Sequence, residues 1–178
     1  SNIFLNNFAI GSSKGEKNFF INHYTGSSSF LRLKKDTQWL NLRSQQYKIK
    51  PEKFLNKVNK TTIYTIDDYC SEKQIEEIDI IKVDTQGYED EVLKGCQKML
   101  FENKINFIEL EIIFSDIYEK SLTISDIESK LQNNYRLFAN DFYGNLYSNM
   151  IYQLNLIYIN KNFYNKSVNI KNEAKSIL

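Results

Sequence analysis

Two runs of mainly apolar residues predict buried strands in the middle of the chain. Residues 78–83 (IDIIKV) are rich in β-branched side chains and are bounded by Glu77 and Asp84, and residues 105–113 (INFIELEII) form the next such run. Short, nearly continuous apolar runs are typical of parallel strands with both faces covered. We therefore expect residues 78–83 to lie mid-sheet, parallel to residues 105–113.

The segments between and after these strands have the spacing of helices. Residues 89–100 place apolar side chains on one helical face, and Ser125 with Glu128 matches a capping box that opens another helix. Residues 135–142 and 152–159 predict two final strands. Their connection is too short for a parallel crossover, so this pair should be antiparallel. The pattern predicts an α/β fold whose sheet is mostly parallel and has an antiparallel final strand.

The first part of the chain is less regular. Residues 32–60 are mixed and basic, with a weak periodicity that predicts no element. Asp67 and Asp68 indicate an acidic turn. Three ranges have the apolar or β-branched content of strands: 4–10, 16–24 and 61–66.

Length and charge limit the classes of function. A chain of 178 residues with a net charge of +1 fits one domain, residues 1–178, and has no basic stripe that would bind a nucleic acid backbone. No apolar run approaches the roughly 18 residues of a membrane span. Neither Cys70 nor Cys96 sits in a CxxC or Cys/His spacing. We therefore expect reduced thiols in a cytoplasmic protein, no bound metal, and neither a nucleic acid nor a membrane as partner.

Candidate chemistry follows the strand at residues 78–83. Asp84 ends this strand, and ligands of open α/β sheets bind outside the carboxyl ends of the strands. Lys82 shares a face with Asp84 because side chains two residues apart in a strand point the same way. The alternative for these two residues is a buried ion pair that ties two strands together. Gly87 is expected to have a positive φ, since the chain turns sharply into a helix there.

The next strand carries two further acids. Glu109 and Glu111 alternate with apolar residues, so they share one face. Glu111 is nearer the carboxyl end and could reach Asp84, whereas the alternative is that this face meets solvent or lysine side chains. His23, the only histidine, is a candidate for contact with substrate, although a histidine without a nucleophile or metal partner is more often ordinary surface.

Residues 78–100 (IDIIKVDTQGYEDEVLKGCQKML) resemble the signature IDxLKIDxEGxExxVLxGA of the FkbM-type S-adenosylmethionine-dependent methyltransferases. The segments NNFAIGSSKGE, SSSF, TIYTIDDYC and INFIELEI resemble other parts of the family pattern, so the resemblance covers roughly residues 4–160. It implies a Rossmann-like class I methyltransferase sheet, S-adenosylmethionine as cofactor, and a small-molecule or glycan substrate with a hydroxyl acceptor.

The resemblance also suggests roles for single residues. The candidates for catalysis are Asp84, Lys82 and Glu111. Asp84 would hold the methionine end of the cofactor or deprotonate the acceptor. The residues expected to bind the cofactor are Ala9, Ile10 and Asp84, and those expected to contact substrate are Gln86, Gly87 and His23.

The sequence departs from the family pattern in two ways. Gln86 stands where the family usually has Glu, which keeps size and hydrogen bonding but removes a negative charge. None of the six glycines forms the glycine-rich turn of the family's first strand and helix, and the resemblance places that turn before Ser1. This predicts a domain truncated at its N-terminus. The alternative to an active enzyme is a non-catalytic remnant of the fold that serves as a binding or interaction module.

Overall fold

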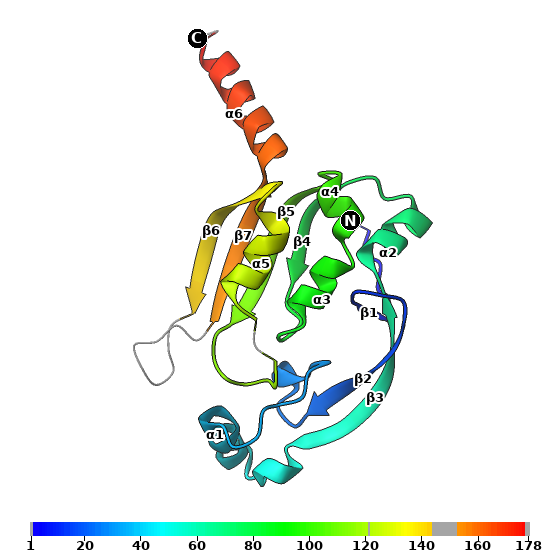
Figure 1. The fold of residues 1–178 in the computed structure, drawn as a ribbon, viewed down its shortest axis with the longest axis vertical. Helices are drawn as coiled ribbons and strands as arrows, with labels where there is room; N and C mark the ends of the chain where they lie inside the picture. The colour runs from blue at the N-terminus through cyan, green and yellow to red at the C-terminus, as the bar shows by residue number, and fades with distance from the viewer. Residues whose placement is uncertain (1, 121, 144–152, 177–178) are drawn as a thin grey trace.

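The computed structural model describes residues 2–120, 122–143 and 153–176, which form two β-sheets joined by helices and loops (Figure 1). The strands are β1 (Ala9–Ile10), β2 (Gly15–Asn22), β3 (Leu55–Tyr64), β4 (Ile78–Val83), β5 (Ile105–Ile113), β6 (Tyr135–Tyr143) and β7 (Gln153–Asn160). The α-helices are α1 (Gln38–Tyr47), α2 (Ile66–Lys73), α3 (Glu89–Lys94), α4 (Gln97–Phe101), α5 (Ile124–Leu131) and α6 (Lys161–Ser176). Two short 3-10 helices are η1 (Thr25–Ser27) and η2 (Pro51–Lys53).

The larger sheet has four strands in the order β4-β5-β7-β6. β4 is parallel to β5, and Val83 pairs with Leu110. β7 is antiparallel to both β5 and β6. These pairings confirm the predicted parallel pair and the antiparallel final strand. Residue 152 of the predicted last strand lies outside the described residues.

The predicted position of β4 in the middle of its sheet is wrong for the described part of the chain, where β4 is an edge strand. Val83 is buried against the helices, but the side chain of Ile80 is 65% exposed. An apolar run shows that a strand packs against something on at least one face. The run does not show how many strands lie beside that strand, and the prediction of a central strand depended on the number of neighbouring strands.

The smaller sheet has the order β1-β3-β2, with β1 parallel and β2 antiparallel to β3. Its strands differ in length from the prediction. The strand expected at residues 4–10 is reduced to the two residues of β1, whereas the one expected at 61–66 begins earlier, at Leu55, and ends at Tyr64. Residues 32–60, for which no element was predicted, contain α1, η2 and half of β3.

The main hydrophobic core lies between the four-stranded sheet and the helices α3, α4 and α5, which cover one of its faces (Figure 1). β5 is the central strand of this core, since Ile108, Leu110 and Ile112 are completely buried. Burial of an aliphatic side chain contributes about 1.5–3 kcal/mol. The core therefore fixes the carboxyl end of β5 relative to that of β4, where the candidate chemistry lies.

The helix predicted at residues 89–100 is broken into α3 and α4 at Gly95. A Cβ atom at this position would lie 2.1 Å from the carbonyl oxygen of Gly11, so only glycine allows the loop after β1 to approach. The nearest neighbour of Gly95 is thus the backbone of another segment.

Two other helix starts also differ from the prediction. Asp67 and Asp68 belong to α2 rather than to a turn, because Thr65 caps that helix by accepting from the Asp68 N–H at 3.0 Å. α5 begins earlier than Ser125 suggests. Its capping box pairs Thr123 with Asp126.

Within the described residues, no helix has both the length and the apolarity needed to cross a membrane. The two cysteines, Cys70 and Cys96, are buried and free. Burial raises the pKa of both thiols, which disfavours the reactive thiolate form.

Candidate functional site

The chain makes a tight turn at residues 84–87, directly after β4. Gln86 has a φ of 56° and Gly87 a φ of 90°, so two successive residues have positive φ. The positive φ predicted for Gly87 is confirmed. A residue other than glycine in this region costs roughly 1–2 kcal/mol, so neighbouring groups must hold Gln86 in place.

Glu89 holds the turn from the side of α3. Its Oε1 atom accepts hydrogen bonds from the Thr85 N–H at 2.9 Å, the Thr85 hydroxyl at 3.1 Å and the Gly87 N–H at 3.2 Å. Burial raises the pKa of Glu89, and these hydrogen bonds partly oppose the rise. The sequence prediction missed Glu89, although it occupies a fixed glutamate position of the family signature.

Ser29 and Tyr118 hold the turn from the opposite side. The Ser29 hydroxyl donates to the Gln86 carbonyl oxygen at 2.9 Å. The Tyr118 hydroxyl lies 3.2 Å from Gln86 Oε1 and 3.1 Å from the carbonyl oxygen of Ser27. Ser29 belongs to the SSSF segment that resembles the family, whereas nothing in the sequence singled out Tyr118.

The Gln86 amide joins two carboxylates from adjacent strands. Its Nε2 atom donates to Glu111 Oε2 at 2.6 Å and to Asp84 Oδ1 at 3.0 Å. From β7, the Gln153 amide donates to the other Glu111 oxygen at 2.9 Å. Three of the predicted site residues, Asp84, Gln86 and Glu111, therefore lie together.

The environment of Glu111 favours its protonated form. Burial raises the pKa of Glu111 most, and the charge and hydrogen bond of Asp84 raise it further, to about 7. The hydrogen bond from Gln86 opposes this rise. A carboxyl group with a pKa near neutral can both accept and release a proton under ordinary conditions.

Lys82 pairs with Glu109 and not with Asp84. Its Nζ atom lies 2.5 Å from Glu109 Oε1 and ties β4 to β5, but the two side chains are 54% and 29% exposed, so the pair is not buried. The hydrogen bond with Glu109 raises the pKa of Lys82. Both alternatives for the two glutamates are thus realised, because Glu109 meets a lysine and Glu111 reaches Asp84.

A cavity of about 360 Å³ opens beside Asp84, between β1 and β4. Ala9 and Ile10 line it from β1, and Asp84 and Gln86 line it from the end of β4. We call it the Asp84 cavity. Its apolar walls are formed by Phe19, Phe30, Ile66, Ile81, Val83 and Val92.

His23 lies elsewhere. It directly follows β2, is exposed, and its backbone N–H donates to the carbonyl oxygen of Phe54 at 3.0 Å. It is not among the described residues that line the Asp84 cavity. Its contact with substrate stays a prediction.

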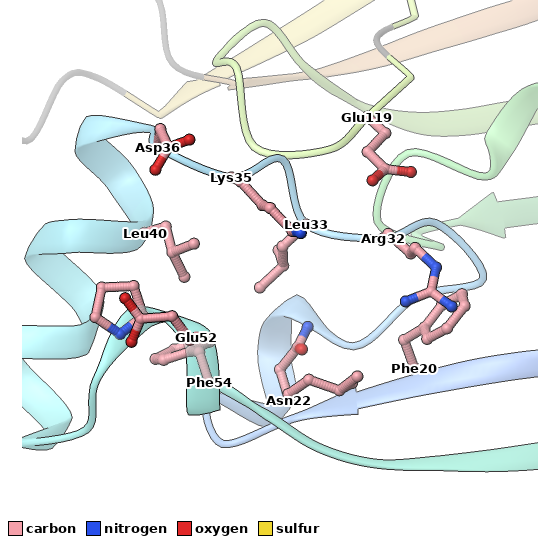
Figure 2. Close-up of a pocket in the computed structure, with 12 residues that line it drawn as sticks. Phe20, Asn22, Arg32, Leu33, Lys35, Asp36, Leu40, Glu52, Phe54 and Glu119 are labelled. Carbon is pink, nitrogen blue, oxygen red and sulfur yellow. The ribbon is translucent and has the colours of Figure 1, made fainter.

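A second cavity, of about 330 Å³, lies between the end of β2, helix α1 and the segment at residues 32–36 (Figure 2). We call it the Arg32 pocket. Its lining residues are Phe20, Asn22, Arg32, Leu33, Lys35, Asp36, Leu40, Pro51, Glu52, Phe54, Leu55 and Glu119.

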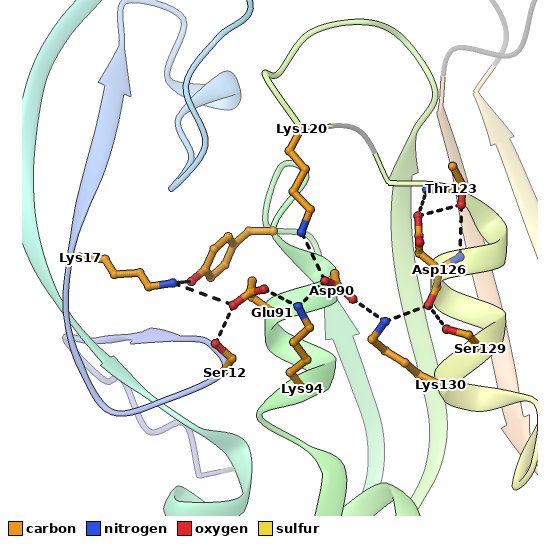
Figure 3. A network of polar contacts seen from close by, with 11 residues as sticks. Ser12, Lys17, Asp90, Glu91, Lys94, Lys120, Thr123, Asp126, Ser129 and Lys130 are labelled. Carbon is orange, nitrogen blue, oxygen red and sulfur yellow. Dashed lines mark hydrogen bonds and ion pairs between the residues drawn. The ribbon is translucent and has the colours of Figure 1, made fainter.

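A third polar feature is a cluster around the buried side chain of Asp90 in α3 (Figure 3). Lys130 and Lys94 lie 2.6 and 2.8 Å from its carboxylate, and Lys120 lies 3.4 Å away. Burial alone raises the pKa of Asp90, but the hydrogen bonds from Lys130 and Lys94 outweigh it and lower the pKa to about 2. The cluster joins α3 to α5 and to the loop after β5.

Comparison with known proteins identifies a family and a relative. The family described as "Methyltransferase FkbM domain" matches residues 1–137. A relative, the 2-O-methyltransferase NoeI of Sinorhizobium fredii (strain NBRC 101917 / NGR234), is 39% identical over 62 residues, which are 35% of this chain and 25% of that protein. The chain thus matches about a quarter of the length of this curated relative. No solved structure matches the chain. Because the family match covers more than half of its length, the chain belongs to the FkbM methyltransferase domain family.

Proposed function

We propose that this chain is the acceptor-facing part of an S-adenosylmethionine-dependent O-methyltransferase that modifies a hydroxyl group of a sugar or another small molecule. The observation that carries the proposal is the Asp84 cavity, in which residues from the ends of β1 and β4 meet. Family membership supports methyl transfer as the reaction class. The printed name of the relative, a 2-O-methyltransferase, supports oxygen as the acceptor atom.

The Asp84 cavity fits the cofactor in two respects. Apolar side chains from β2, β4 and α3 form its walls, as an adenine ring and the methylene groups of the methionine chain require. The carboxylate of Asp84 offers an acceptor for the amino group at the methionine end, and Ala9 and Ile10 lie across the cavity from it. When bound, S-adenosylmethionine would supply an electrophilic methyl group.

The fold supports a further part of the proposal, that residues 1–178 form a single, partial domain with a Rossmann-like sheet. The order β4-β5-β7-β6 has a parallel pair followed by a reversed strand. In the described residues the outer edge of β4 has no strand partner, and Ile80 is exposed beside it. Strands of a parallel sheet normally have both faces covered. We infer that a further strand belongs next to β4.

In this mechanism the protein mainly holds the acceptor oxygen against the methyl carbon, because methyl transfer is an in-line displacement. Asp84 faces the cavity and accepts the proton of the acceptor hydroxyl. Glu111 shares the Gln86 amide with Asp84, and its pKa, raised to about 7, lets Glu111 take up or release a proton near neutral pH. Gln86 holds the two carboxylates at hydrogen-bond distance and fixes their direction.

The proposal is tested on the protein in its natural length with isotope-labelled S-adenosylmethionine and a panel of mono- and oligosaccharide acceptors. We expect Asp84→Asn to fold with an unchanged melting temperature and to lose on the order of a hundredfold or more in rate, the range that a positioned acid or base contributes. Asp79→Asn is the matched control, since Asp79 lies on the same strand, is exposed and does not line the cavity.

Two outcomes contradict the proposal. If Asp84→Asn stays within a few-fold of the parent rate, Asp84 has a structural role and the chemistry lies elsewhere. If the parent protein transfers no methyl group to any acceptor, the alternative of a non-catalytic remnant is favoured.

A further inference from the structure

The Arg32 pocket lies on the opposite face of the smaller sheet from the Asp84 cavity. Neighbouring side chains in a strand point to opposite faces, and in β2 Phe19 lines the Asp84 cavity while Phe20 lines the Arg32 pocket. The two cavities are therefore separate spaces. The pocket plays no part in the chemistry proposed above, so its lining calls for its own explanation.

The lining combines an apolar floor with charged groups that have no protein partner. The ring of Phe54 is buried, and the guanidinium group of Arg32 stacks on Phe20 at 4.4 Å from the ring centroid. Within the described residues, no ion pair or side-chain hydrogen bond is made by the charged groups of Arg32, Lys35, Asp36, Glu52 and Glu119. All five side chains are exposed, so their donors and acceptors face solvent and are open to a ligand.

Asn22 adds a buried polar group to the pocket. Its side chain is 1% exposed, and its amide nitrogen donates to the carbonyl oxygen of Ser27 at 2.8 Å. Asn22 also lines the pocket, so this hydrogen bond holds a polar side chain at the pocket wall.

The charges in the pocket indicate a neutral ligand. Three carboxylates disfavour an anion, and the nearby Arg32 and Lys35 disfavour a cation. A sugar ring meets both requirements, because its C–H face packs on an apolar floor while its hydroxyl groups donate to carboxylates and accept from guanidinium and ammonium groups. The volume of about 330 Å³ is at the small end of ligand pockets.

Two chain segments connect the pocket to the turn at residues 84–87. Ser29, which donates to Gln86, lies three residues before Arg32. Tyr118, whose hydroxyl lies against Gln86, is followed directly by Glu119, and the Glu119 N–H donates to the Arg32 carbonyl oxygen at 3.0 Å. A ligand that orders the pocket therefore acts on segments that hold the candidate catalytic turn.

We propose that the Arg32 pocket binds a saccharide unit of the methyl acceptor, away from the hydroxyl group that is methylated. The role of the pocket in binding the methyl acceptor rests on the proposed function. The binding of a saccharide to the pocket does not depend on that function. Binding of a remote unit of the substrate contributes to positioning the reactive one.

The test measures saccharide binding without S-adenosylmethionine. The protein is first applied to an immobilised array of mono- to tetrasaccharides, and the strongest binder is then titrated in solution while the fluorescence of Trp39 is recorded. Trp39 is the only tryptophan of the chain, and its ring lies 6.2 Å from that of Phe54 in the pocket floor. We expect saturable binding and a change in this fluorescence.

Variants locate the binding site. We expect Arg32→Gln and Glu119→Gln each to weaken binding at least about tenfold. Arg136→Gln is the matched control and should leave binding unchanged, because Arg136 also stacks on an aromatic ring, that of Tyr164 at 4.6 Å, but lies in β6 and outside the pocket. Glu119 is exposed, so its variant keeps the test valid if Arg32→Gln fails to fold.

The inference is overturned if no saccharide on the array binds, or if Arg136→Gln weakens binding as much as Arg32→Gln. Neither result decides the proposed function, since that function is tested separately by the methyl-transfer rate of Asp84→Asn. Conversely, saccharide binding that depends on Arg32 and Glu119 stands even when no methyl transfer is detected.

Discussion

At the scale of residues, Gln86 gives the candidate site its particular character. Its amide donates one hydrogen bond to Asp84 and one to Glu111. The glutamate that the family usually has at this position could not donate to either carboxylate in its ionised form. The departure from the family pattern therefore replaces a third negative charge with a bridge between two acids.

This pair gives the first prediction on pH. The folded-state pKa of Glu111, about 7, is above its ordinary value of 4.5, so the folded protein binds this proton more tightly than the unfolded chain. The resulting stability is fully present below about pH 4.5 and is lost as the pH rises through 7. We expect the melting temperature to fall by a few degrees between about pH 5 and pH 8, and Glu111→Gln to show a flatter profile.

Glu109→Gln is the control for this prediction, because Glu109 lies on the same face of β5 but pairs with Lys82 near the surface. Its profile should follow that of the parent protein. A Glu111→Gln profile as steep as the parent's would show that another group causes the loss of stability.

The residues of the site were predictable where local rules apply. Asp84 follows from its place at the end of a strand, and Glu111 from the alternation of side chains in β5. Gln153 and Tyr118 were not predictable, since the first depends on the pairing of Ile113 with Gln153 across two antiparallel strands and the second lies in the loop after β5. Both contacts depend on the register of paired strands and on the path of a loop. The spacing of apolar residues along the sequence reveals neither of these.

At the scale of elements, the sequence pattern identified which segments pack together better than where they end. The apolar face of residues 89–100 continues across Gly95 because α3 and α4 both pack against the same core. The backbone of Gly11, far away in the sequence, leaves no room for a side chain at the break. In the same way, the composition of β4 predicted a strand but could not show that it lies at the edge of the described sheet.

The cluster around Asp90 gives a prediction at this scale, because one side chain joins three segments (Figure 3). The Asp90 carboxylate is 8% exposed and pairs with lysines of α3, α5 and the loop after β5. Replacing it by Asn leaves those lysines without their common partner. We expect Asp90→Asn to lower the free energy of unfolding by roughly 2–4 kcal/mol at neutral pH, measured by urea denaturation.

The pH dependence of this effect has a definite sign. The pKa of Asp90 is lowered from 3.8 to about 2, so its contribution is present above about pH 4 and is lost as the pH falls toward 2. Asp116→Asn is the control. Asp116 pairs with Lys34 at 2.7 Å, but both side chains are about half exposed, so its loss should cost less than about 1 kcal/mol. Equal effects of the two substitutions would argue against a buried junction at Asp90.

At the scale of the whole molecule, the two sheets define where a cofactor could lie. The Asp84 cavity is formed where the smaller sheet, through β1 and β2, faces the end of β4 in the larger one. It offers apolar walls and the carboxylate of Asp84. Binding of a small ligand with high affinity normally needs several well-placed polar groups in addition to apolar surface.

The last prediction is that the chain of 178 residues binds S-adenosylmethionine only weakly. None of the five glycines in the described residues belongs to a glycine-rich turn at the start of a helix, where backbone N–H groups would meet the ligand, and the Asp84 cavity provides one acidic group at one end. We expect a Kd of about 1 mM or weaker by isothermal titration calorimetry, equivalent to no more than about 4 kcal/mol of binding free energy. Micromolar binding that is weakened by Asp84→Asn would contradict this expectation and would show that the cavity between β1 and β4 holds the cofactor without further parts of the sheet. Micromolar binding that is insensitive to Asp84→Asn would place the cofactor outside the Asp84 cavity and would require a different assignment for Ala9 and Ile10.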